Sequence, residues 1–266
     1  MPRMKTFYYS DPLNDDFASS KDKITPIVVD DKYKYEHKSF VYKLCSFILY
    51  RIIATPIAFV ITKLIYGLRI KNKKVLRKIK GGYFLYGNHT NALSDVFSPS
   101  MACFPRAVKI VANPNGVSIP VVGKITPMLG ALPLPSTLSA TKNFLRAMKN
   151  SLNKGNVIMI YPEAHIWPYY NEIRPFADSS FAYPIKFDAP VVAFAVTYRK
   201  RKIFKKLPPL ITLTLSDAFY PKDFASKTEL RNAVCDFMTD TVKTEGSVAY
   251  HNYVYKEKTN EDCNSL

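Results

Sequence analysis

Short apolar runs bounded by turn residues alternate along the chain with longer segments that carry apolar residues at helical spacing. The runs predict strands at 83–86, 107–112, 131–134, 156–161, 191–198 and 211–215. The longer segments predict helices at 92–103, 118–129, 140–152 (capped by Thr137 or Ser139) and 227–242. Strands that alternate with helices indicate an α/β fold, with a central, mostly parallel sheet flanked by helices.

An apolar segment, residues 40–70, precedes the first of these strands. Pro56 divides it, and its longest stretch without a charged residue, 52–62, is shorter than the roughly 18 residues expected of a membrane span. This pattern favours two short helices, 40–54 and 56–69, that lie in one leaflet as a membrane-associating motif. A pair of buried core helices and a single tilted span remain open alternatives.

The charge of the chain indicates an anionic partner. The 266 residues contain 38 Lys and Arg against 21 Asp and Glu, a formal net charge of +17. Basic residues cluster at 69–80, directly after the apolar segment, and again at 199–206. A basic cluster beside an apolar anchor is typical of a peripheral or monotopic protein on the cytoplasmic face of an anionic membrane. No nucleic-acid-binding motif accompanies the charge, so no nucleic-acid partner is expected.

Polar side chains suited to catalysis follow the first predicted strand. Gly87 and Asn88 favour a turn, which presents His89 six residues before Asp95. A histidine beside a carboxylate can act as an oriented general base, because the carboxylate fixes its tautomer and stabilises the imidazolium. No nucleophilic Ser or Cys lies at an elbow nearby, so the substrate would supply the nucleophile. A turn histidine with a structural role is the alternative.

The strand at 156–161 ends in a similar way, at Pro162-Glu163-Ala164-His165. Parallel strands bring their carboxyl ends to one edge of a sheet, which is where α/β proteins build their sites. In this order and spacing, the blocks Asn88-His89…Asp95 and Pro162-Glu163 resemble the lysophosphatidic acid (1-acylglycerol-3-phosphate) O-acyltransferase family. Two weaker blocks, 130–134 and 189–196, extend the resemblance over about residues 80–200.

The resemblance implies an enzyme of phospholipid biosynthesis. It would move an acyl chain from acyl-CoA or acyl-carrier-protein to a hydroxyl of a lysophospholipid, by default 1-acylglycerol-3-phosphate, with no metal or bound cofactor. His89 and Asp95 would be catalytic, and Asn88 and Glu163 would contribute to acceptor binding. The oxyanion would be bound by backbone N–H groups at the start of the helix after His89 or near Glu163.

Departures from the family pattern concern spacing and the acceptor's phosphate. Five residues separate His89 from Asp95 where four are usual, so we expect His89 in a loop and Asp95 near the start of the helix. Ser136 and the segment 164–166 stand where the family often carries arginines associated with the phosphate. Arg174 is the remaining candidate for an anionic acceptor group. Another lysolipid or a glycolipid therefore remains an alternative acceptor.

The chain divides into a polar arm (1–38), membrane-associating helices (39–80), an acyltransferase domain (81–245) and an irregular tail (246–266). The arm either packs on the domain or is an extended lead-in, and it lacks the apolar core of a secretory signal. The cysteines at positions 45, 103, 235 and 263 have neither paired nor metal-ligand spacing, which fits a reducing compartment.

Two other functional classes fit parts of the sequence. A metal-dependent hydrolase could use His89, Asp95, Glu163 and His165, whose side chains are of zinc-binding types, if the two distant loops converge. A non-catalytic basic membrane-associated protein would keep the same composition without turning over an acyl donor.

Overall fold

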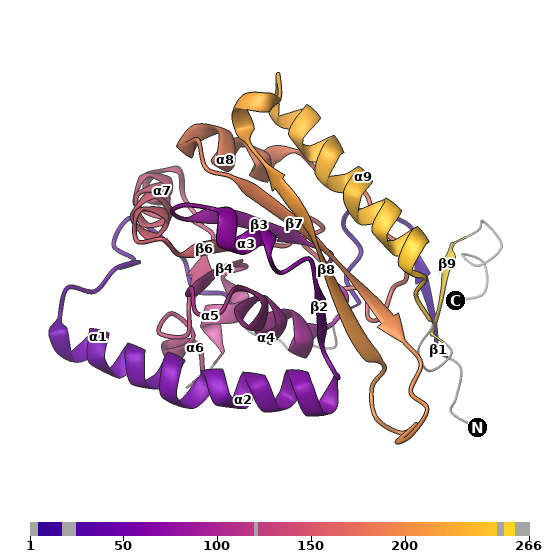
Figure 1. Cartoon of the computed structure of the whole chain (residues 1–266). Helices are drawn as coiled ribbons and strands as arrows, with labels where there is room; N and C mark the ends of the chain where they lie inside the picture. Colours follow the sequence, from indigo (N-terminus) through magenta and orange to yellow (C-terminus); the bar gives the residue numbers. More distant parts are fainter. Residues whose placement is uncertain (1–4, 18–24, 120–121, 249–252, 259–266) are drawn as a thin grey trace.

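A seven-stranded sheet forms the centre of the computed structural model, which describes residues 5–17, 25–119, 122–248 and 253–258 (Figure 1). The strand order is β2-β8-β7-β3-β6-β4-β5, and every neighbouring pair is parallel except β7 and β8. The strands are β2 (Arg69–Lys71), β3 (Tyr83–Gly87), β4 (Val108–Ala112), β5 (Ala131–Pro133), β6 (Val157–Ile160), β7 (Val191–Arg199) and β8 (Leu210–Phe219). The predicted α/β class is confirmed. β3, β6 and β7 are almost wholly buried, as central strands covered on both faces should be.

Helices cover both faces of this sheet (Figure 1). One face packs against α7 (Leu138–Asn153), α8 (Ala182–Phe187) and α9 (Lys227–Glu245), and the other packs against α3 (Val75–Lys78) and α4 (Ala92–Cys103). α9 buries residues four apart, Leu230, Val234 and Met238, on its sheet-facing side. Two 3₁₀ turns, η3 (Ser179–Phe181) and η4 (Pro221–Asp223), precede α8 and α9.

The apolar segment forms one continuous helix of 26 residues, Phe40–Ile65, so the predicted break at Pro56 is wrong. Within it, α1 (Phe40–Phe47) and α2 (Thr55–Val60) are joined and followed by π-helical turns, η1 (Ile48–Ala54) and η2 (Ile61–Ile65). In the wide turn before Pro56, the Thr55 N–H donates to the Tyr50 carbonyl, five residues back. This extra width accommodates the proline ring, which would otherwise collide with the carbonyl four residues earlier.

The helix predicted at 118–129 is two short ones, α5 (Asn115–Ser118) and α6 (Val122–Ile125). Pro120, which was expected to begin that helix, lies outside the described residues. Gly123 sits where a Cβ atom would meet the Val117 carbonyl oxygen at 2.3 Å, so only glycine permits this close packing of the two turns.

The arm and the tail meet in a small parallel sheet, which corrects the expectation of an irregular tail. Its strands are β1 (Lys5–Tyr9) and β9 (Tyr253–Glu257), at the right of Figure 1. The arm also packs on the domain through Phe7 and Val29, both of which are buried. Residues 1–4, 18–24, 249–252 and 259–266 of the predicted arm and tail lie outside the described residues.

Candidate active site

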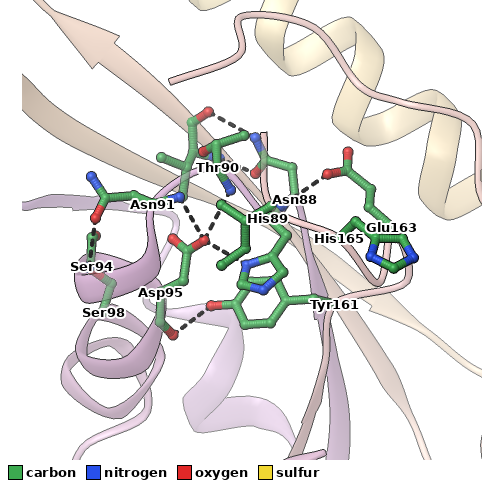
Figure 2. Close-up of polar contacts among 12 residues, drawn as sticks. Asn88, His89, Thr90, Asn91, Ser94, Asp95, Ser98, Tyr161, Glu163 and His165 are labelled. Atoms are coloured by element: carbon green, nitrogen blue, oxygen red, sulfur yellow. Dashed lines mark hydrogen bonds and ion pairs between the residues drawn. The ribbon is translucent and has the colours of Figure 1, made fainter. Parts of the chain in front are cut away.

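His89 and Asp95 meet at the carboxyl edge of the sheet, between the end of β3 and the first turn of α4 (Figure 2). His89 Nδ1 lies 2.8 Å from Asp95 Oδ2. The histidine side chain is 18% exposed and the carboxylate 2%. The predicted placement, with the histidine in the loop and the aspartate at the helix start, is therefore confirmed.

The turn between the two residues is organised by the same carboxylate oxygen. Asp95 Oδ2 also accepts hydrogen bonds from the backbone N–H groups of Thr90 and Asn91, each at 2.9 Å. Asn91 caps α4, because its side-chain oxygen accepts from Ser94 N at 2.8 Å. These bonds accommodate the additional residue between His89 and Asp95. With Nδ1–H donating to the carboxylate, the histidine is held in the tautomer whose Nε2 can accept a proton.

Tyr161, at the end of β6, is a site residue that the sequence analysis missed. Its ring stacks on the His89 ring with centroids 4.3 Å apart, and its hydroxyl donates to the Asp95 backbone carbonyl at 2.6 Å (Figure 2). Burial raises the pKa of Tyr161 well above its usual value, so the hydroxyl stays a neutral donor. The sequence offers no signal for this role, because Tyr161 reads as the last apolar residue of a buried strand.

Glu163 and Arg174 form a buried ion pair behind His89. Glu163 Oε2 accepts from the His89 backbone N–H at 3.0 Å and from Arg174 Nη2 at 3.2 Å, while Oε1 accepts from the Arg174 backbone N–H at 3.1 Å. Burial raises the pKa of the Glu163 carboxyl, and the guanidinium and the two N–H groups oppose that shift. Both side chains are only 1% exposed. The carboxylate therefore fixes the backbone that carries His89.

Arg174 differs most from its expected position as a ligand for an anionic acceptor. Besides Glu163, its guanidinium donates to the backbone carbonyls of His165 and Pro12, and it lies 5.0 Å from the Trp167 ring centroid. Asn88 is also turned inward: its side-chain oxygen accepts from Val196 N at 2.8 Å and its amide donates to Val196 O at 3.2 Å. Neither side chain presents a polar group to an acceptor in this arrangement.

The residues of this edge lie within a region that matches a known family. A family model described as Acyltransferase matches residues 67–197, which hold both polar turns. Residues 67–197 belong to the acyltransferase family. The predicted enzyme class, an O-acyltransferase, is confirmed.

A solved structure supports the fold of this acyltransferase. It is the 1-acyl-sn-glycerophosphate (LPA) acyltransferase PlsC from Thermotoga maritima, with a TM-score of 0.56 and 16% sequence identity. The match covers 79% of this chain and 89% of that chain. No curated protein matches the chain in sequence.

The N-terminal arm covers the loop that follows Glu163 in this acyltransferase. Trp167 Nε1 donates to the Asp15 carbonyl at 2.7 Å, and Phe17 N donates to the Ile166 carbonyl at 3.1 Å. The arm also reaches the middle block, where Val29 N donates to Ser136 Oγ at 3.0 Å. The two places where this chain lacks the arginines expected from the family pattern, Ser136 and the segment 164–166, are thus in contact with the arm.

His165 does not join the other candidate metal ligands. Its Nδ1 lies 3.6 Å from Asp16 Oδ2 of the arm. Among the described residues, no group of three or more His, Cys, Asp or Glu side chains is placed to hold a metal ion. The hydrolase alternative therefore has no ligand set in the described part of this acyltransferase.

Proposed function

We propose that the protein transfers a fatty acyl chain from an acyl thioester to a hydroxyl of a lysophospholipid, with 1-acylglycerol-3-phosphate as the default acceptor. The observation that carries this proposal is the His89–Asp95 pair, 2.8 Å apart at the carboxyl edge of an acyltransferase sheet. Within the described residues, His89 Nε2 has no hydrogen-bond partner, and its ring remains partly exposed. The pair is thus arranged to take a proton from a bound alcohol.

In the proposed reaction, His89 Nε2 accepts the proton of the acceptor hydroxyl while its oxygen attacks the thioester carbonyl. Asp95 stabilises the imidazolium. When the tetrahedral intermediate collapses, the carbon–sulfur bond breaks, the ester forms, and the imidazolium returns its proton to the thiolate. CoA or the carrier protein leaves as a thiol. The transfer needs no metal or bound cofactor.

Backbone N–H groups at the start of α4 are the proposed donors for the oxyanion. Those of His89, Thr90 and Asn91 are bound to the carboxylates of Glu163 and Asp95. Within the described residues, the N–H groups of Ala92 and Leu93 have no hydrogen-bond acceptor, since the first turn of a helix has none of its own. They are the donors left for a developing negative charge.

Asn88, Glu163 and Arg174 are proposed as positioning residues rather than substrate ligands. Asn88 ties the His89 loop to β7, and the Glu163–Arg174 pair ties it to the loop after β6. All three side chains are buried, and apart from Arg174 Nε their polar groups already have protein partners, which an acceptor would have to displace. Support for the acceptor's headgroup must then come from other groups, which leaves a different lysolipid or a glycolipid as the alternative acceptor.

The long N-terminal helix, Phe40–Ile65, is proposed to dock the enzyme on the cytoplasmic face of an anionic membrane. Only 6% of its most apolar stretch is buried. Contacts near both ends hold it against the domain: Ser46 Oγ donates to the Met128 carbonyl at 2.9 Å, and Thr62 is fully buried. A helix fixed along its length to a globular domain fits a monotopic arrangement in the interface better than a span.

The decisive experiment incubates membranes containing the protein with labelled acyl-CoA or acyl-carrier-protein and a panel of lysolipids. We expect labelled diacyl product, and a loss of at least about 10²-fold in His89→Ala. His165→Ala is the matched control, because that histidine contacts the arm and should retain activity. Activity should also survive a metal chelator.

Each outcome of this panel discriminates between the alternatives. Product from lysophosphatidic acid supports the default acceptor, and product from another lysolipid alone replaces it while keeping the mechanism. Full activity in His89→Ala would refute the proposed base. Membrane binding without acyl transfer from any donor would favour the alternative hypothesis of a non-catalytic, basic membrane-associated protein.

A further inference from the structure

The loop between β7 and β8 carries an exposed apolar tip within a basic sequence. Ile203 and Phe204 are 71% and 73% exposed, and Leu207 is also exposed. Ile203 and Phe204 stand within Arg199-Lys-Arg-Lys-Ile-Phe-Lys-Lys206, and Leu207 directly follows this segment. Large apolar side chains with lysines on both sides match the two layers of an anionic membrane surface, hydrocarbon beneath and charged headgroups above.

The tip is fixed to the C-terminal end of the long N-terminal helix. Arg201 Nη2 donates to the carbonyl of Ile65, the last helical residue, and Arg199 Nη2 donates to the Gly67 carbonyl at 3.0 Å. On the other side of the loop, Ile211 N donates to the Tyr66 carbonyl at 2.8 Å. In Figure 1 the loop projects below the sheet, on the side where the helix lies. The helix and the tip would therefore reach one planar surface together.

Both segments lack acidic residues. The sequence has no Asp or Glu from 37 to 94, which includes the helix and the basic cluster at 69–80, and none from 189 to 216, which includes the tip. A surface formed by two separate acid-free segments is complementary to an anionic bilayer and continuous from one segment to the other.

The backbone at Phe204 supports a role for this residue outside the folded core. Its φ is 55°, in the left-handed region that disfavours a residue with a Cβ atom. The ring is mostly exposed, so its burial in the protein does not offset that cost. A bulky aromatic residue that is both strained and exposed at such a position points to a contact outside the protein.

We infer that the β7–β8 tip is a second membrane-inserting element, with Ile203 and Phe204 entering the acyl region and Lys202, Lys205 and Lys206 contacting anionic headgroups. This inference rests on the proposed docking of the N-terminal helix, to which the tip is bonded. Two points of attachment fix the rotation of the domain about the helix axis. The active-site edge of the sheet then keeps one orientation toward the bilayer.

The test places a tryptophan at the tip. Phe204→Trp protein is mixed with phosphatidylcholine–phosphatidylglycerol vesicles, with and without brominated acyl chains. The native Trp167 is the chain's only tryptophan and is buried, so it provides a constant background. We expect a blue shift and quenching by brominated lipid. Phe59→Trp, on the exposed face of α2, reports docking of the helix.

The matched control is Tyr220→Trp. Tyr220 is partly exposed and directly follows β8, whose ten residues place it about 33 Å from the tip. It should show neither shift nor quenching. If Phe59→Trp is quenched and Phe204→Trp is not, the tip does not insert and the inference is overturned while the helix still docks. If neither is quenched, the proposed docking fails and the inference fails with it.

Substitutions separate insertion from folding. Phe204→Gly should keep its thermal stability, because glycine favours the left-handed φ, yet bind vesicles at least about tenfold more weakly. Lys205→Gln and Lys206→Gln should each weaken binding about fivefold on anionic vesicles and not on neutral ones. Lys222→Gln, at the Tyr220 end, is the charge control. Unchanged vesicle affinity in Phe204→Gly would overturn the inference.

Discussion

The two halves of the active site are held by different kinds of structure. The first half, His89 and Asp95, is local: six residues of chain and one helix start bring its groups together. The second half, Glu163 and Arg174, depends on a loop, an N-terminal arm and a C-terminal strand that are far apart in sequence. The comparison fits the proposed function, in which the first half carries out the chemistry and the second half holds the first in place. Variants of the first half should therefore lose activity, whereas variants of the second half should lose stability.

The largest expected effect is on the local half. Asp95→Asn should reduce kcat by about 10²-fold or more, because an amide does not stabilise the imidazolium. In a His89→Ala background the same change should cost little, since the two residues act as a unit. Asp16→Asn, which alters the other His–Asp contact, is the control and should leave kcat unchanged. Steady-state kinetics of all four proteins would expose any independent role for Asp95.

Substitutions in the second half should mainly lower the stability of the protein. Arg174→Ala leaves the buried Glu163 carboxylate without its partner and should lower the free energy of unfolding by about 3–5 kcal/mol. Lys227→Ala breaks a pair with Asp178 at the surface and should cost less than about 1 kcal/mol. Denaturant unfolding measures both. A stable Arg174→Ala protein with a raised KM for the acceptor would instead restore Arg174 as a substrate ligand.

Substitutions in the N-terminal arm, which packs on the loop after Glu163, should have a smaller effect on stability. The Phe17 ring lies 5.2 Å from that of Trp167, so Phe17→Ala should admit water and shift the tryptophan emission to longer wavelength. The stability loss should be about 1–2 kcal/mol, since Phe17 is only partly buried. Tyr8→Ala, at an exposed position of β1, should change neither. An unshifted spectrum in Phe17→Ala would show that the arm does not shield the loop.

The sequence predicted the elements whose signal is local. Apolar runs located β3, β4, β6 and β7 to within a residue of their observed ends, and the helix after His89 was predicted with its exact bounds of 92–103. The errors occurred where backbone geometry depends on a partner. Pro56 does not break its helix because a π-helical turn accommodates it, and the tail is ordered where β9 pairs with β1.

The same distinction, between local signals and geometry that depends on a partner, explains which site residues the sequence predicted correctly. The spacing of His89 and Asp95 was sufficient to place both residues. Arg174 was expected to face an acceptor because an isolated sequence shows a cation without showing its partners. Only the folded chain reveals that Glu163 and the Pro12 carbonyl already bind it. Tyr161 was missed for the opposite reason, since its hydroxyl is invisible in a pattern that counts it as apolar.

Tyr161 joins the two halves and should give the smallest effect. Tyr161→Phe keeps the ring that stacks on His89 and removes the hydroxyl bound to the Asp95 carbonyl. The loss of one hydrogen bond, about 0.5–1.5 kcal/mol, should lower kcat by no more than about tenfold and leave KM unchanged. Tyr161→Ala, which removes the stack as well, should cost more. If Tyr161→Phe instead loses as much activity as Asp95→Asn, the hydroxyl acts on the substrate itself. The division between a local chemical half and a distant supporting half would then be wrong.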